Sequence, residues 1–494
     1  MKRNEDYFII ELPLEVEKWQ ADIIDKRLEC GRHLYNSLLS IVLNRYNEMI
    51  KTKKYRELYG SLTHNKKYDD PIWKQINDLE NRFRLSKFDV IEDIKHMSNH
   101  FSGLMNSQVC QEIAKQVWSA IKSIMHKPSK SVHFKKFGAF NSLSGSQRTR
   151  AIIFKGDYID FGKLHIRIKY PKNENDFSYF EKFLFPNLDN LKFCKIVRKQ
   201  IRCKSRYYVQ LVFAGNAIKD RYSIGTGRVG IDIGTSTVAV SSNTSVELLE
   251  LAKESQSFEK EKSNLQRKMD RSRRSTNPNK FNPDGTIKKG NTGRWVFSNS
   301  YKRLRSEYSD ICRKQKQSRE VSHNKLVNDI LKLGDSFFVE DMNFSGLAKR
   351  SKSKTEYVAK NKCKKKKRYG KSICNRAPSM FLSILERKLN YFGLNLNRIN
   401  TKSCKASQYD HITDTFTKKK LSNRWHIFEN GTKVQRDLYS AFLIANVSDS
   451  LDSIDKELCD MNFDVFIKMH DDKIKEFLGE KNSTNRKFLT SMGI

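Results

Sequence analysis

The sequence lacks the features that mark membrane, secreted and disulfide-bonded proteins. It has no apolar run near the roughly 20 residues that a membrane-spanning helix needs. Its first residues, Met1–Tyr7, are followed by only a short apolar run before Glu11, which does not predict a signal peptide. Its nine cysteines are odd in number and scattered, without the spacing of a disulfide framework. We therefore expect a cytoplasmic protein with reduced thiols and no membrane partner.

Acidic side chains are scarce relative to basic ones. Lys and Arg number 94 against 56 Asp and Glu, which gives a formal net charge of +38 over 494 residues. A fold does not need this excess, which costs self-repulsion and favours a polyanionic partner such as nucleic acid. Hydrophobic residues still make up 38% of the chain, with 30 Phe and 19 Tyr. The chain can therefore build a core and is not a disordered basic tail.

The apolar pattern of the first half changes from strand to helix and back. A strand over 7–12 precedes helical periodicity across 16–125, and short strands parted by glycines begin near 152. Residues 192–201 and 206–213 alternate as a hairpin with an unusually basic ribbon. Several short strands in this span suggest a small β-barrel, into which the helical region is inserted after the first strand.

The second half alternates strands and helices, as an α/β domain does. A cation-dense stretch, 348–371, has the composition of a disordered segment or of one that RNA orders. The other expected segments are a strand pair over 230–242, a basic stretch at 258–274, a Gly/Asn/Pro-rich loop at 275–297, a helix at 298–331, a strand at 336–340, a helix at 378–392, a strand at 394–399, an irregular basic insert at 400–433 and a helix at 435–447.

Three acids lie on elements that the pattern places in the core. Asp232 lies within the apolar stretch Gly230–Val240, Glu340 ends a strand, and Asp437 opens an apolar helix. A lone Asp in a strand is more often a cap or a salt-bridge partner. Ribonuclease-H-like folds, however, need this order of acids to hold two Mg²⁺ ions about 4 Å apart, one activating water and the other stabilising the leaving 3′ oxygen. The order predicts a metal-dependent phosphodiesterase.

The stretch that begins Gly230-Ile231-Asp232 also resembles the first phosphate loop of actin-like sugar kinases. That alternative needs a second Asp-x-Gly phosphate loop and a Gly-Gly adenosine motif downstream. The segment Glu340–Asn343 has neither, and no Gly-Gly pair occurs in the chain. A net charge of +38 is also unusual for an enzyme that acts on small sugars. We therefore favour the phosphodiesterase.

Residues 229–242, 336–347 and 434–446 resemble the three RuvC motifs of the transposon-encoded TnpB nucleases and of their relatives, the miniature type V CRISPR effectors. The resemblance extends over most of the chain. It implies an RNA-guided, Mg²⁺-dependent DNA endonuclease with a single RuvC-like site, in which the guide RNA reads the sequence of double-stranded target DNA. The residues that match the family's catalytic and metal-binding acids are Asp232, Glu340 and Asp437.

The family implies an α+β multidomain fold with a ribonuclease-H-like (RuvC) nuclease domain, a small β-barrel wedge domain and an inserted helical recognition lobe, in a prokaryotic cytoplasm. The implied domains are residues 1–15 (first strand of the wedge), 16–127 (recognition lobe), 128–222 (remainder of the wedge), 223–399 (nuclease domain with a basic helical insert at 255–333), 400–433 (degenerate zinc-ribbon-like insert that binds target nucleic acid) and 434–494 (last RuvC helix and tail).

Basic residues near aromatic ones are the expected contacts to guide RNA and target DNA. Solvated strand and helix faces are the simpler explanation of such residues, but Phe134 and Phe137 flank two of the lysines. The candidates are Lys135, Lys136, Arg198, Lys199, Arg202, Arg206, Arg267, Lys268, Arg271, Arg273, Arg274, Lys418, Lys419 and Arg424.

One feature departs from the family, whose members usually carry a zinc ribbon with two C-x-x-C knuckles before the third motif. Here only Cys404 remains, and adding His411 and His426 gives three ligands at a spacing that matches no ribbon. We expect the insert to fold without zinc, using apolar residues such as Leu421, Trp425 and Phe428. The alternatives to a nuclease are a guided DNA-binding repressor that no longer cuts and a transposition accessory protein without guide RNA.

Overall fold

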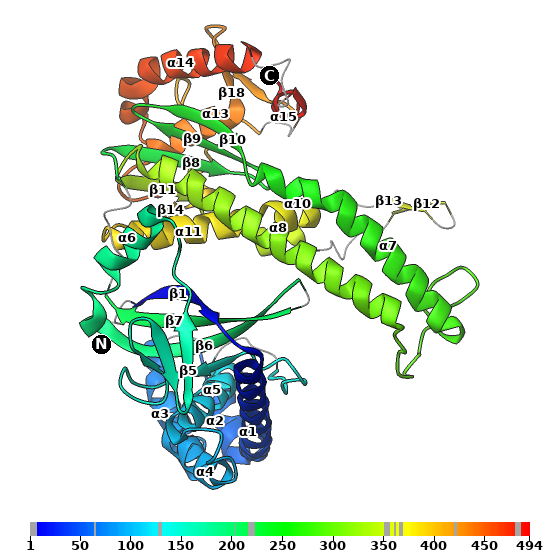
Figure 1. The fold of residues 1–494 in the computed structure, drawn as a ribbon. Coiled ribbons are helices and arrows are strands. Elements are labelled where there is room, and N and C mark those ends of the chain that lie inside the picture. The colour runs from blue at the N-terminus through cyan, green and yellow to red at the C-terminus, as the bar shows by residue number, and fades with distance from the viewer. Residues whose placement is uncertain are drawn as a thin grey trace. The chain divides into compact units, whose positions relative to one another are not determined.

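The computed structural model describes residues 7–63, 66–126, 131–202, 204–215, 223–349, 356–359, 362–364, 369–418, 422–479 and 486–494. The chain forms two compact units, Met1–Ala217 and Ile218–Ile494. Both mix helices with sheet, so the expected α/β organisation in several parts is confirmed (Figure 1). Among the described residues, no helix has the length and apolar character needed to cross a bilayer. Half of the cation-dense stretch 348–371, together with Lys419 and Leu421, lies outside the described residues.

The first unit contains the helical region that the periodicity predicts. Helices α1, α4 and α5 pack against one another around Leu28, Leu38 and Val117, which are fully buried. A 34-residue α1 is held by this packing, because its apolar stripe faces the two other helices. The helices are α1 (Lys18–Lys51), α2 (Lys53–Gly60), α3 (Lys66–Arg82), α4 (Lys87–Asn99), α5 (Ser107–His126) and α6 (Glu174–Phe183).

A seven-stranded antiparallel sheet, in the order β2-β6-β7-β1-β5-β4-β3, completes the first unit. Strand β3 at one edge of the sheet also contacts β6 near the other edge, so the sheet curls into a half-barrel. The sequence predicted a small barrel, and the observed sheet is only half closed. The predicted hairpin is confirmed as β6 and β7. The strands are β1 (Tyr7–Glu15), β2 (Ser142–Ser144), β3 (Ile153–Phe154), β4 (Tyr158–Phe161), β5 (Leu164–Ile168), β6 (Leu191–Ile201) and β7 (Lys204–Ala214).

The second unit is built on a five-stranded sheet in the order β10-β9-β8-β11-β14. Strands β8, β11 and β14 run parallel, whereas β9 and β10 are antiparallel to their neighbours. Parallel strands are buried on both faces, which explains the nearly continuous apolar runs around Ile231 and Phe338. The strands are β8 (Arg228–Ile233), β9 (Thr237–Ser242), β10 (Val246–Glu250), β11 (Ser336–Glu340) and β14 (Leu396–Ile399).

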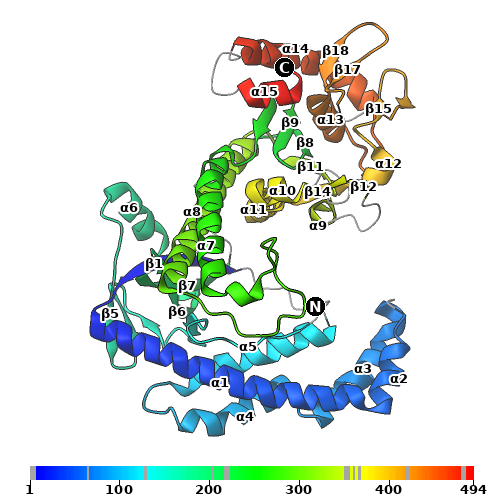
Figure 2. The ribbon, with the colours of Figure 1, turned by 90° about the vertical axis from the view of Figure 1, so that its right-hand side faces the viewer.

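Helices cover both faces of this sheet (Figure 2). On one face α8 (Asn299–Leu331) and α11 (Pro378–Tyr391) share a core with Val229, Ile231 and Phe337. On the other face α13 (Arg436–Ala445), α14 (Lys456–Gly479) and α15 (Arg486–Met492) share a core with Ala239 and Phe338. The segment after α13, expected as a tail, therefore forms two helices whose apolar residues complete the second layer.

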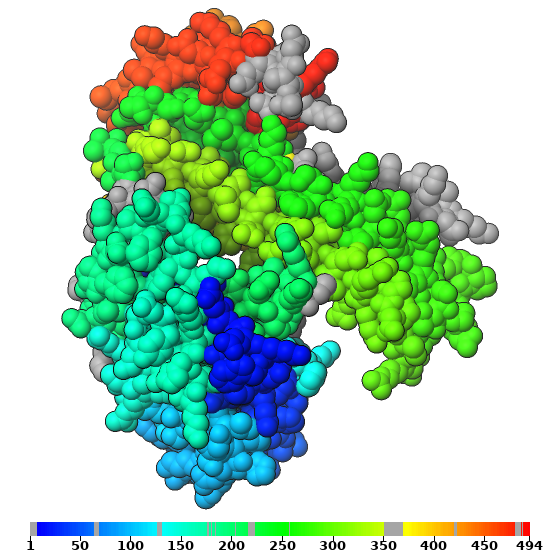
Figure 3. All heavy atoms as spheres, in the orientation of Figure 1, coloured from blue at the N-terminus to red at the C-terminus, as the bar shows by residue number. Residues whose placement is uncertain are grey.

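Helix α7 (Glu259–Thr276) pairs with α8 through Leu265, Leu304 and Ile311, and the far end of this pair projects from the rest of the second unit (Figure 3).

The remaining elements are the 3-10 turns η1 (Leu188–Asn190), η3 (Lys253–Phe258) and η4 (Pro278–Lys280), the helices α9 (Phe344–Ala348), α10 (Gly370–Arg376) and α12 (Thr401–Cys404), and the strands β12 (Glu356–Ala359), β13 (Lys362–Lys364), β15 (Tyr409–Asp410), β16 (Thr415–Phe416), β17 (Trp425–Ile427) and β18 (Lys433–Gln435).

Candidate active site

Two of the predicted acids lie on neighbouring parallel strands and face the same layer. Asp232 on β8 pairs with Ala239, and Glu340 at the end of β11 pairs with Ile399. Both partners belong to the core under α13, and residues paired across a ladder point to one face of a sheet. Val339 and Ile231 are in register, so the next residue on each parallel strand is an acid. The two carboxylates are therefore lateral neighbours on the α13 face.

Helix α13 brings the third acid to the same place by running antiparallel to β8. The Arg228 guanidinium, at the start of β8, donates to the Ala445 carbonyl over 2.8 Å. Two residues further along β8, a Cβ at Gly230 would lie 2.1 Å from the Ala441 carbonyl oxygen. Two strand residues advance about 6.6 Å and four helix residues about 6 Å. Moving two more residues along β8, from Gly230 to Asp232, corresponds to moving four residues back along α13, from Ala441 to Asp437. Asp232 therefore lies opposite Asp437.

The pKa of Asp232 responds to both of the other acids, as expected for neighbouring groups. The pKa of Asp232 is raised well above its usual range, chiefly because the carboxylate has lost hydration and further because Glu340 and Asp437 are negative neighbours. The Arg436 guanidinium opposes this shift but does not cancel it. Burial also raises the pKa of Glu340. The site is a cluster of like charges in which an added cation would be favourable.

Asp437 is held at the start of α13 by its own surroundings. The Gln435 side chain caps the helix by accepting from the Leu438 N–H at 2.9 Å, and the N-terminal helix dipole favours a carboxylate in the first turn. Arg436 Nη2 lies 3.2 Å from Asp437 Oδ1, and Arg424 Nη1 lies 3.6 Å from Oδ2. The sequence predicted Arg424 as a nucleic-acid contact and did not single out Arg436, although it immediately precedes the acid.

The donor chemistry of the three acids suits Mg²⁺, which prefers carboxylate oxygen ligands. Their mutual repulsion, seen in the pKa of Asp232, is what a divalent cation would relieve. Within the described residues, however, no three His, Cys, Asp or Glu side chains converge closely enough to share a metal ion. The fold thus brings three suitable ligands near one another, but not close enough to share one ion. Asp437 is ion-paired with Arg424 and Arg436.

In metal-free protein we expect Asp232→Asn to stabilise the second unit at pH 8, because the amide removes an ionisation that burial and the neighbouring Glu340 and Asp437 disfavour. An acid whose pKa is raised on folding contributes stability below its unfolded pKa, near 3.9, and loses it as pH rises through the folded value. The amide cannot ionise, so its advantage should vanish near pH 4. Urea unfolding in chelator across this range measures it, and a pH-independent difference would contradict the like-charge cluster.

The described part of residues 400–433 packs on α13 through aromatic and histidine side chains. His411 Nδ1 lies 2.7 Å from the Tyr439 hydroxyl, and the His426 ring stacks on Tyr439 at 4.9 Å. His426 Nε2 also lies 3.0 Å from Asp410 Oδ2. Phe428 is buried in the same cluster, as predicted. The histidines that could have bound zinc thus have other partners on the helix that carries Asp437.

Cys404 is buried, and its Sγ lies 3.6 Å from the Leu451 carbonyl oxygen. Burial raises the pKa of this thiol, whereas zinc binds the thiolate. We predict well under one zinc per chain by elemental analysis, and unchanged melting temperature and activity in Cys404→Ser or in chelator at saturating Mg²⁺. Stoichiometric zinc that is lost together with cleavage in Cys404→Ser would show instead an unusual ribbon.

Four of the predicted nucleic-acid contacts form one exposed stripe on α7. The opposite side of the helix packs on α8 through Leu265, so the stripe faces away from that contact. Spacings of three, four and seven residues among its members place them on one side of the helix. Its residues are Arg267, Lys268, Arg271 and Arg274. Arg273 is instead partly buried at the end of α7, beside Phe281 and Trp295.

Reversing the charge of these four residues should weaken RNA binding strongly and lower the salt slope by about 0.7 to 0.9 for each phosphate that the protein no longer neutralises. The unfolding transition should stay unchanged, because the side chains are exposed. Titration of binding against salt measures the slope. Reversal of Lys51, Lys54, Arg56 and Lys74, which are also exposed, gives the same change in net charge outside α7. Equal losses of affinity in both variants would show that net charge alone, without an α7 site, controls binding.

The other predicted contacts divide between the surface and the fold. Lys135, Lys136, Arg202, Arg206 and Lys418 are exposed. Lys199 is ion-paired with Glu11 and lies 4.6 Å from the ring centre of Tyr208.

Arg198 is 8% exposed, and its guanidinium binds Asp25 at 2.9 Å and the Asn141 side chain at 3.0 Å. We therefore assign Arg198 to the fold and correct its prediction as a nucleic-acid contact. A partner 173 residues away is not visible in a local pattern.

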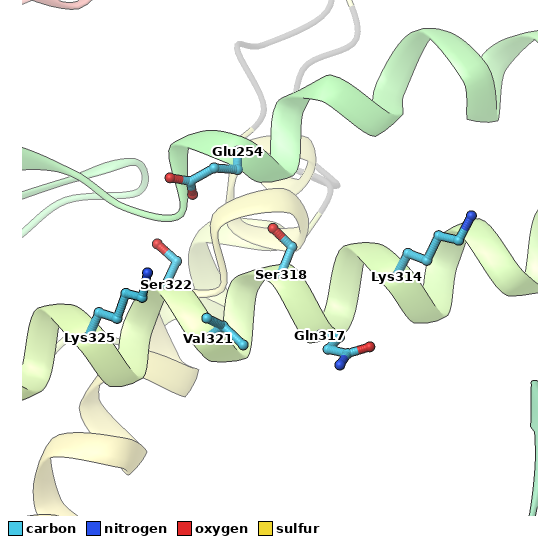
Figure 4. A pocket seen from close by; sticks show the side chains of 7 residues that line it. All are labelled: Glu254, Lys314, Gln317, Ser318, Val321, Ser322 and Lys325. Atoms are coloured by element: carbon cyan, nitrogen blue, oxygen red, sulfur yellow. The ribbon is translucent and has the colours of Figure 1, made fainter. Parts of the chain in front are cut away.

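One hollow on the second unit is not lined by the acids. It is a shallow groove of about 450 Å³ along α8, in which Lys314 and Lys325 lie at the two ends and Ser318 and Ser322 between them (Figure 4). Glu254 faces the groove from η3.

No protein-family model matches the chain, and no curated protein is similar to it. Among solved structures, one match is titled a cryo-EM structure of the Cas12f1-sgRNA-target DNA complex. It shares 11% identity and a TM-score of 0.43 over 90% of this chain and 99% of that one. A second, titled a CRISPR-Cas12f ternary complex, shares 12% identity and a TM-score of 0.27 over 89% of this chain and 99% of that one. These values describe a distant similarity in chain trace.

Proposed function

We propose that the chain is a divalent-metal-dependent nuclease whose active site is formed by Asp232, Glu340 and Asp437. The observation that carries this proposal is the gathering of three acids, from two parallel strands and one helix, under α13. The pKa of Asp232 is raised first by burial and then by its negative neighbours Glu340 and Asp437. Strongly perturbed carboxyl groups of this kind cluster at functional sites, which supports the assignment.

The arrangement supports a ribonuclease-H-like (RuvC) nuclease domain. The acids come in the expected order, on a central strand, on the strand beside it and at the start of a late helix. When bound, Mg²⁺ would activate water and stabilise the leaving oxygen of a phosphodiester. Asp232, Glu340 and Asp437 would hold it, and Arg424 and Arg436 supply positive charge beside the acids, which favours the approach of a phosphate backbone.

The specific form that we propose is an RNA-guided, Mg²⁺-dependent DNA endonuclease of the TnpB type. The net charge of +38 supports tight binding of nucleic acid. Part of that charge lies on the surface, in the exposed α7 stripe. The three motifs that contain the acids resemble those of this family. Guide RNA would then supply sequence recognition, and the protein would bind backbone and heteroduplex shape.

The test begins with sequencing of the RNA that copurifies with the full chain. Duplex DNA matching each RNA segment, and a scrambled duplex, are then incubated with the complex in Mg²⁺, Ca²⁺ or chelator. We expect cleavage of one matching duplex in Mg²⁺, with binding but little cleavage in Ca²⁺, whose looser coordination misplaces the nucleophile. Monodisperse protein free of nucleic acid at low salt would contradict the guided function. Cleavage that persists in chelator would contradict the metal site.

A further inference from the structure

The loop between α5 and β2 exposes two phenylalanine rings to solvent. Phe134 is 50% exposed and Phe137 is 83% exposed, whereas Phe140, three residues later, is 4% exposed. Phe140 fills the space above α1 so closely that a Cβ at Gly31 would lie 2.8 Å from its ring. The loop is therefore anchored at its β2 end, and the exposure of the first two rings is not the exposure of a loosely packed segment.

Hydrogen bonds from two different elements fix the shape of this loop. The Asn36 side chain on α1 makes both possible bonds to the Lys135 backbone, donating to its carbonyl at 2.9 Å and accepting its N–H at 2.8 Å. The Gly138 N–H donates to Glu29 Oε1 at 2.9 Å, and the Gly138 carbonyl accepts from Arg198 Nη2 at 3.0 Å. The buried Arg198 thus helps to fix the loop backbone in the conformation that exposes the rings of Phe134 and Phe137.

The charge around the rings indicates the kind of partner. Lys135 and Lys136 lie between the two phenylalanines, and residues 131–139 contain no acid. The Lys135 ammonium lies 5.4 Å from the ring centre of Tyr35, so its stem follows α1, whereas Lys136 is exposed. Exposed aromatic faces beside cations suit a partner that presents both flat rings and negative charge. An apolar protein surface would gain nothing from the lysines and would have to desolvate them.

We propose that Phe134 and Phe137 form a stacking platform for unpaired bases of a nucleic-acid strand, whose phosphates Lys136 contacts. The platform rests on the proposed function only in that nucleic acid is the partner, and it does not involve the three acids. Stacking on an aromatic ring tolerates any base, because every base has a flat face. The same chemistry serves an RNA or a DNA strand, so both are offered in the test.

The test uses the full chain carrying Asp232→Ala, which prevents cleavage, and short single-stranded RNA and DNA containing 2-aminopurine. We expect the emission of the probe to be quenched on binding by stacking. Phe134→Ala and Phe137→Ala should each lower affinity on the order of 5- to 150-fold and relieve the quenching, without changing the salt slope, since a phenylalanine ring neutralises no phosphate. Tryptophan at either position should restore both readouts. Phe88→Ala removes an equally exposed ring (82%) on α4 and should change neither.

Alanine variants that bind and quench like the parent, or whose affinity falls no more than that of Phe88→Ala, would overturn the platform. So would loss of affinity that tryptophan does not restore, or that appears only with a protein partner. Preferential loss with the RNA or with the DNA probe would identify which strand it holds and would support it. Quenching with Asp232→Ala, together with no cleavage by the unsubstituted chain, would leave the platform standing and overturn the nuclease, whereas cleavage by the unsubstituted chain without quenching would do the reverse.

Discussion

Asp232→Ala, Glu340→Ala and Asp437→Ala should each lower the rate of DNA cleavage by on the order of 10³-fold or more, which is about 4 kcal/mol of transition-state stabilisation. Each substitution removes one carboxylate from the group that would hold the metal, and the remaining two cannot fix its position. Affinity for guide RNA and target should remain within about twofold, because the α7 stripe, which we expect to contact phosphates, is untouched. Single-turnover cleavage together with a filter-binding assay separates the two quantities.

A matched control lies directly beside one of the acids. Asp341 follows Glu340, is exposed, and lies 3.8 Å from Arg398 rather than facing α13. Asp341→Ala changes the net charge by the same amount as Glu340→Ala and should cleave at the parental rate. A site alanine variant that retains near-parental cleavage would refute the assignment of that acid. An equal loss of activity in Asp341→Ala would mean that the effect reflects charge or folding.

The sequence predicted the acids because each lies in a strong local pattern. Asp232 and Glu340 interrupt or end apolar strands, and Asp437 opens an apolar helix, so the element that carries each acid could be predicted without knowledge of the fold. The helices of 16–125 and the hairpin of β6 and β7 were predicted for the same reason. The face of the sheet on which each acid lies depends on the register of the strands. The pairing of Asp232 with Ala239 and of Glu340 with Ile399 establishes that face.

Long-range partners explain what the sequence did not predict. Arg198 follows the buried Cys194 and Ile196 on the inner face of β6, and its partners there, Asp25 and Asn141, are distant in the sequence. Helix α14 was not predicted, although Cys459, Phe466, His470 and Phe477 recur at helical spacings of seven, four and seven residues. The histidine cluster around Tyr439 depends on contacts between the insert and α13. No spacing rule describes such contacts, whereas zinc knuckles have one.

Gly230→Ala should destabilise the second unit by about 3 kcal/mol or more and should abolish cleavage with it. The added Cβ would lie 2.1 Å from the Ala441 carbonyl oxygen and 2.3 Å from the Ala445 nitrogen. Both are backbone atoms, so α13 as a whole would have to move away from β8, and Asp437 would move with it. A displacement of 1 Å at a reacting centre can cost about 100-fold in rate. Glycine inside a strand often marks such a close approach of two backbones.

Chemical unfolding and single-turnover cleavage of Gly230→Ala, compared with Gly479→Ala, measure both effects. Gly479 ends α14 in the same unit, and a Cβ there would meet no atom within 4 Å. Alanine at this helical position should be neutral or stabilising by up to about 1 kcal/mol, because it reduces the entropy lost on folding. A Gly230→Ala variant that is as stable and active as the parent would mean that α13 does not lie against β8. The position of Asp437 opposite Asp232, and with it the proposed metal site, would then lose its structural basis.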